Sequence, residues 1–148
     1  MQNQSPNCAP FSKALGVLMG HYDSEIRANE KRVNSLRSRI HEAFKNRDIN
    51  EHKYREWQSA CKEFHSQYDN LAFPGGFDGA YERILNGDSK SIEAALCFVE
   101  VRPYFFRSGY MYKDFLRKLG RAPLKGNDLC RYQSIKEAYI EYRETKNT

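Results

Sequence analysis

The stretch between residues 102 and 121 concentrates side chains that could bind an anion. It carries six basic residues against a single acidic residue, Asp114. Arginine and lysine recognise phosphate and carboxylate groups, and tyrosine and arginine are enriched where proteins bind partners. We expect a partner to contact seven residues of this stretch: Arg102, Tyr104, Arg107, Tyr110, Lys113, Arg117 and Arg121.

The spacing of three of these cations predicts a basic stripe on a helix. Lys113, Arg117 and Arg121 are four residues apart, with Phe115 and Leu119 between them. Residues four apart share one face of a helix, so the cations would lie opposite an apolar face. The stripe could bind a phosphate, an RNA backbone or an acidic protein surface, or it could be an ordinary solvated face.

Residues 104–110, which lead into this helix and include its first residues, are named here the aromatic turn. Ser108 is predicted to cap the helix, whose first backbone N–H groups would favour an anion. The aromatic side chains of the turn either pack inward as core, which we favour, or face a partner. The sequence leaves open whether Phe105 and Phe106 are core or exposed.

The rest of the chain shows no recognisable catalytic or cofactor-binding pattern. Its four histidines, at positions 21, 41, 52 and 65, have no second ligand at metal-binding spacing. The glycine-rich segment Phe73–Gly79 lacks the Lys-Ser/Thr pair of a phosphate-binding loop. We therefore expect a protein that is not an enzyme, with no catalytic residue, metal or cofactor. An enzyme with a pocket at Phe73–Gly79 is the least favoured hypothesis.

The four cysteines are widely spaced, at Cys8, Cys61, Cys97 and Cys130. They form no C-x-x-C pair, and Cys61 and Cys97 fall on apolar faces, where a free thiol behaves as a small hydrophobe. Buried reduced thiols are typical of cytosolic proteins, so we predict a cytoplasmic location and regard a disulfide as the weaker alternative.

Composition predicts one folded domain covering residues 1–148. Hydrophobic residues make up 40% of the 148 positions and aromatic residues 14%, which excludes a disordered chain. The net charge of +5 is mildly basic and below that of a dedicated nucleic-acid binder. Because no segment approaches the ~20 apolar residues of a membrane helix, we expect a soluble protein.

Heptad patterns predict a long antiparallel helical hairpin over residues 24–72. In the first helix, Ile26, Val33 and Ile40 recur every seven residues. Steps of three and four residues connect the inner positions of the second helix, which are Tyr54, Trp57, Cys61, Phe64, Tyr68 and Leu71. The hairpin could also serve as a homodimer interface.

Shorter helices are predicted over residues 80–142, around a central helix at Ser91–Val101. That helix is apolar on most of its circumference, which indicates burial among other elements, and Pro103 ends it. The neighbouring helices are Ala80–Leu85, Ser108–Gly120 and a last one around Leu129–Tyr142. The fold class is therefore all-α, a hairpin followed by a compact group of three to four shorter helices.

Capping signals and weak termini complete the prediction. Asp48 stands at capping-box spacing from Glu51, and Asp88 is a plausible N-cap of the central helix. Residues 1–9 are expected to form a flexible tail, residues 11–19 a marginal helix, and residues 141–148 a frayed end.

The leading functional hypothesis is a non-enzymatic protein-binding module that uses residues 102–121. Such a module would act as an adaptor, a regulator or an inhibitor that neutralises its partner. The alternative is an RNA- or DNA-binding helical protein that uses the basic stripe of the same region. Basic residues of the first long helix, Arg37 among them, could contribute, although acidic neighbours dilute them.

Overall fold

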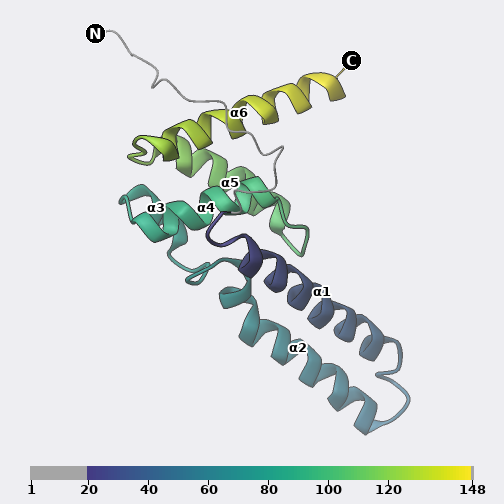
Figure 1. Cartoon of the computed structure of the whole chain (residues 1–148). Coiled ribbons are helices and arrows are strands. Elements are labelled where there is room, and N and C mark those ends of the chain that lie inside the picture. The colour runs from purple at the N-terminus through teal and green to yellow at the C-terminus, as the bar shows by residue number, and fades with distance from the viewer. Residues whose placement is uncertain (1–19, 148) are drawn as a thin grey trace.

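A computed structural model of the protein describes residues 20–147, which form six α-helices joined by short connections (Figure 1). The helices are α1 (Asp23–Lys45), α2 (Glu51–Ala72), α3 (Ala80–Leu85), α4 (Ser89–Val101), α5 (Ser108–Arg121) and α6 (Asn127–Lys146). No strand forms within residues 20–147, so the all-α prediction is confirmed. The predicted tail and the helix at residues 11–19 lie outside the described residues.

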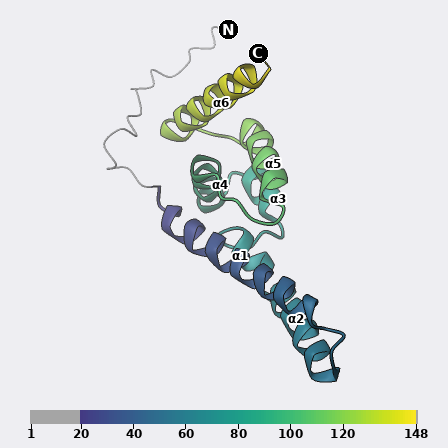
Figure 2. The same ribbon diagram turned by 90° about the vertical axis from the view of Figure 1, so that its right-hand side faces the viewer.

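The predicted hairpin is formed by α1 and α2, which pack side by side and project from the compact group of the other helices (Figures 1 and 2). Ile26, Val33 and Phe64 are buried in it, as the heptad pattern requires. The pattern is wrong for Tyr54, which is 42% exposed near the connection between α1 and α2, whereas Ala60 is buried.

The caps of the helices differ in part from the prediction. Asn50, not Asp48, caps α2, because it directly precedes the first helical residue and its side chain accepts a 2.8 Å hydrogen bond from the Lys53 N–H. Asp88 caps α4 as predicted and accepts hydrogen bonds from the hydroxyl and the backbone N–H of Ser91. These bonds lower the pKa of Asp88.

The central helix α4 lies between α1 and α6, as Figure 2 shows. Within it, all residues from Ala94 to Val99 are buried, which confirms the expected burial. The Phe98 ring contacts the Phe115 ring of α5 at 5.0 Å between centroids, and Phe115 stacks on Phe73 at 4.7 Å. These rings join α4, α5 and the end of α2 into one core.

A buried arginine connects α6 to α4. Arg131 is 7% exposed, and its guanidinium donates hydrogen bonds to the carboxylates of Glu93 and Glu100, both on α4. Burial lowers the pKa of Arg131, but the bonds and charges of Glu100 and Glu93 outweigh burial and raise it. Arg131 therefore stays charged. The helix α6 extends to Lys146, through most of the segment 141–148 that the sequence predicts to fray.

The cysteines follow the prediction only in part. Cys61 and Cys97 are free, and burial raises the pKa of the Cys97 thiol to about 12. Cys130, at the start of α6, is disulfide-bonded, so the preference for reduced thiols is wrong for this residue. None of the described helices is both long and apolar enough to cross a lipid bilayer.

Replacing the buried arginine tests how α6 is held. Arg131→Ala should lower the free energy of unfolding by about 3–5 kcal/mol, because it leaves two largely buried carboxylates without their cation. The measurement is urea unfolding followed by circular dichroism. Arg55→Ala is the control, since it breaks an exposed pair with Glu51 and should cost about 0.5 kcal/mol or less. Equal losses in the two variants would contradict the role of the triad.

Candidate anion-binding groove

The aromatic turn is attached to both helices of the hairpin. The Tyr104 backbone N–H donates to the Glu30 carboxylate, and the Tyr104 carbonyl accepts a 3.0 Å hydrogen bond from the Asn34 side-chain amide. The Tyr68 hydroxyl of α2 donates to the Phe106 carbonyl at 2.7 Å. The turn is therefore held in one position by residues that are distant in the sequence.

Two arginines of this region adopt a backbone conformation that favours glycine. Arg102, after the last residue of α4, has φ of 54°, and Arg107, before the first residue of α5, has φ of 68°. They are the non-glycine residues with positive φ among residues 20–147. This left-handed conformation costs roughly 1–2 kcal/mol per residue. The backbone conformation of both arginines is therefore locally unfavourable.

The cap predicted at the start of α5 is wrong. Ser108 is the first helical residue, and Arg107 precedes it in the N-cap position without a side-chain cap. The Ser108 hydroxyl instead accepts a 2.9 Å hydrogen bond from the Phe105 N–H. The left-handed conformation of Arg107 brings the two residues together, so the serine closes the turn and does not cap the helix.

The aromatic residues of the turn divide into buried and exposed ones. Phe105 is 7% exposed and belongs to the core, and Phe106 is half-buried against it. Tyr104 and Tyr110, by contrast, are 84% and 76% exposed. The favoured inward interpretation is therefore correct for Phe105 and wrong for the two tyrosines.

A groove of about 720 Å³ lies between the aromatic turn, α1 and the C-terminal half of α6. None of the described residues that line it is an aspartate or a glutamate. Six cations line it: Arg37, Arg102, Arg107, Lys113, Arg143 and Lys146.

A smaller groove of about 550 Å³ continues from it between α5 and α6. Lys113, Tyr139 and Arg143 line both grooves, and the smaller one adds the cations Arg117 and Lys136. It too has no acidic side chain among its described lining residues. We call the two together the basic groove, which eight cations line in all.

Aromatic rings contact five of the six cations of the larger groove. The Arg102 guanidinium lies over the Tyr112 ring at 4.6 Å and over the Tyr142 ring at 5.1 Å from the centroids. Two arginines lie over the Phe106 ring, Arg37 at 4.8 Å and Arg107 at 5.3 Å from its centroid. On α6, Arg143 lies 5.9 Å from the centroid of Tyr139, and Lys146 lies 5.1 Å from that of Tyr142.

These cation–π contacts have a consequence for ligand binding. A cation held near an aromatic ring is attracted to the ring without donating its N–H groups to a carboxylate. A carboxylate partner would instead use those N–H groups and neutralise the charge. The larger groove therefore presents positioned cations whose charge is not cancelled by an acidic lining residue.

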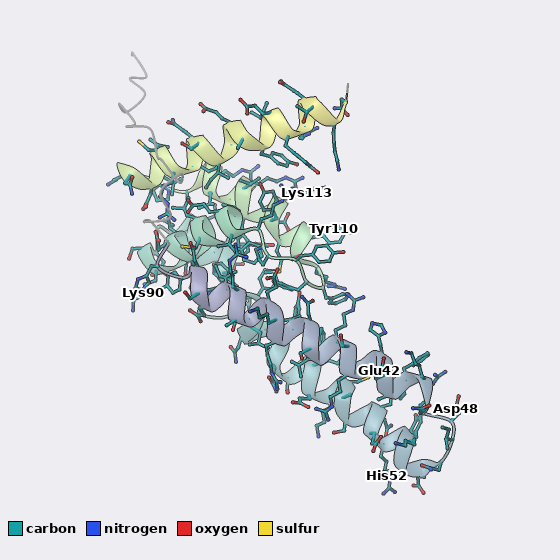
Figure 3. The ribbon with its side chains drawn as sticks, turned by 45° about the vertical axis from the view of Figure 1, so that its right-hand side comes forward. Glu42, Asp48, His52, Lys90, Tyr110 and Lys113 are labelled. Atoms are coloured by element: carbon teal, nitrogen blue, oxygen red, sulfur yellow. The ribbon has the colours of Figure 1, made fainter. Side chains whose placement is uncertain are left out.

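The structure separates the seven residues predicted to bind a partner. Arg102, Tyr104, Arg107 and Lys113 line the larger groove, and Arg117 lines the smaller one. Tyr110 projects on the same side of the molecule as Lys113, as Figure 3 shows, without lining either groove. Arg121 is exposed at the end of α5 and is also in neither lining, so the two grooves include only part of the predicted stripe.

Sequence reasoning missed the contribution of α6. Tyr139, Tyr142, Arg143 and Lys146 line the larger groove, although three of them belong to the segment expected to fray. Of the basic residues on α1, Arg37 joins the groove, whereas Arg32 and Arg39 pair with Glu63 of α2.

The structure also tests the other proposed sites. Residues 20–147 contain no group of three or more metal-ligating side chains that could hold an ion. A hollow of about 560 Å³ lies at the glycine-rich segment, and Asp69, Asp78 and Glu82 are among its lining residues. The Asp69 carboxylate accepts a 2.8 Å hydrogen bond from the Asp78 N–H, a contact that stabilises the turn.

No protein-family model, no curated protein and no solved structure matches this chain. The geometry and charge of the basic groove are therefore the observations from which a function is proposed.

The left-handed arginine gives a test of local strain. Arg107→Gly should leave the free energy of unfolding unchanged within about 0.5 kcal/mol, because glycine relieves the strained φ while it adds entropy to the unfolded chain. The same change in the exposed interior of α5, Arg117→Gly, should cost about 1 kcal/mol. Thermal unfolding of both variants measures the difference. An equal loss at the two positions would show that Arg107 is not strained.

Proposed function

We propose that this chain is a non-enzymatic binding protein that captures a polyanionic partner in the basic groove. The observation that carries the proposal is the lining of eight cations without an acidic residue among the described ones. The whole chain has 24 basic and 19 acidic residues, so acidic side chains are abundant elsewhere. A ligand with several negative charges would supply what the groove lacks.

The contacts and backbone of the groove's cations favour a role in ligand binding over a role in stabilising the fold. Each ring-held cation keeps hydrogen-bond donors for a ligand, and both left-handed arginines line the groove despite their backbone cost. Positioned cations lose little side-chain entropy when a ligand binds, which favours affinity. They also attract an acidic partner over a distance and raise its association rate.

Two classes of partner meet this requirement. An acidic segment of a partner protein would make the chain an adaptor, a regulator or a neutralising inhibitor, which is the leading hypothesis from the sequence. A nucleic acid is the alternative. Homodimerisation through the hairpin remains a separate prediction, which the groove neither requires nor opposes.

A cytoplasmic location also remains a prediction. The free thiols of Cys61 and Cys97 support it, whereas the disulfide at Cys130 is typical of oxidising compartments.

Charge reversal in both parts of the groove tests the proposal. The probes are a labelled polyglutamate peptide and a labelled oligouridylate of equal length, measured by fluorescence anisotropy at low and physiological salt. The wild-type protein should bind at least one probe with an affinity that falls with salt. Arg107→Glu with Arg117→Glu should weaken that binding by roughly tenfold or more.

The matched control is Lys45→Glu with Lys62→Glu, which changes the net charge equally at exposed positions of the hairpin, away from the groove. It should bind like the wild type. If both double variants lose affinity equally, the groove is not the site, and if neither probe binds at low salt, the proposed function is wrong.

A further inference from the structure

We propose that the polyanion is a single-stranded nucleic acid, whose backbone follows the cations of the basic groove while its bases stack on Tyr104 and Tyr110. This inference rests on the proposed function, because it needs the groove to be the binding site. Three observations carry it: two exposed tyrosine rings, the fixed backbone that presents them, and the charge pattern of the groove.

The first observation is that two kinds of aromatic ring surround the groove. The rings of Tyr112, Tyr139 and Tyr142 already carry cations on their faces. Tyr104 and Tyr110 are the most exposed large hydrophobic residues of the described chain. Their faces are available for stacking, since none of the ring contacts among residues 20–147 involves them.

The second observation is that both exposed rings have a fixed backbone. Tyr104 is held from α1 through its N–H and its carbonyl, by Glu30 and Asn34. Tyr110 belongs to the first turn of α5 and directly follows Gly109, which lines the larger groove. An apolar ring that is presented outward on a rigid backbone loses little entropy when it binds, so it suits a binding platform.

The third observation is the density of positive charge. A nucleic-acid strand carries one phosphate on each nucleotide, so it matches a lining of cations at every step. A peptide would need a carboxylate at nearly every position to do the same. Positive grooves combined with aromatic platforms are how proteins bind single strands with little sequence preference.

The position of the two exposed rings beside the groove also favours a single strand over a duplex. Bases of a duplex are stacked and paired inside the helix, so their faces are not accessible to Tyr104 or Tyr110. Unpaired bases can turn outward from a bound backbone and stack on both rings. We therefore expect single strands to bind more tightly than duplexes of the same length.

The experiment uses the full chain and four labelled probes of about 12 nucleotides or residues, a length within known single-strand sites. These are oligouridylate, an abasic oligomer with the same number of phosphates, an RNA duplex, and polyglutamate. Anisotropy titrations should rank oligouridylate first. The logarithm of its affinity should fall against the logarithm of salt concentration with a slope of about −0.7 for each phosphate contacted.

Tyrosine variants separate stacking from charge. Tyr104→Ala and Tyr110→Ala should each weaken oligouridylate binding on the order of 5- to 100-fold, and should leave binding of the abasic oligomer unchanged. Phenylalanine at either position should restore the affinity, because it keeps the ring. Tyr54→Ala, which removes an exposed ring from the hairpin, is the matched control and should have no effect.

The outcomes distinguish this inference from the proposed function. Equal binding of oligouridylate and the abasic oligomer, or tighter binding of duplex or polyglutamate, would overturn the single-strand inference and leave a polyanion-binding groove. Binding of none of the four probes at low salt would overturn both.

Discussion

The burial of α4 on every side is the constraint on which the rest of the structure depends. An apolar helix of this kind requires neighbours around its whole circumference, and α1, α3, α5 and α6 supply them. Its two acidic residues, Glu93 and Glu100, both contact Arg131, so the need to compensate buried charge positions α6. One helix thereby determines where the hairpin and the last helix lie.

The end of α4 then determines the basic groove. Pro103 prevents the helix from continuing, and the chain leaves through the left-handed Arg102. The following turn is attached to α1 and α2, while Arg102 lies over a ring of α5 and a ring of α6. Because the same residues end a helix, join four elements and line the groove, the binding surface is part of the fold and not an appendage of it.

The sequence predicts well the features that depend on neighbouring residues. It predicts poorly the groove, where residues from helices far apart in the sequence meet. The heptads give the hairpin, and Ala80–Leu85 is predicted with its observed bounds, because both depend on neighbouring residues. Arg37 and Arg143 reach the groove from helices that lie far apart in the sequence, and no spacing rule connects them. Lys113, Arg117 and Arg121 share one helix as their spacing predicts, but helical spacing describes a single helix, whereas a groove needs two walls.

A modest net charge conceals a strong separation of charge. On the hairpin, acids and bases neutralise one another in exposed pairs such as Lys45–Glu42 and Arg55–Glu51. In the larger groove, five of the six cations lie over aromatic rings instead. Exposed pairs contribute little to stability and are screened by salt, so the hairpin exerts only a weak field. The larger groove therefore gathers positive charge without an acidic side chain among its described lining residues, and that charge would attract an acidic ligand toward Arg102 and Arg107 before any contact forms.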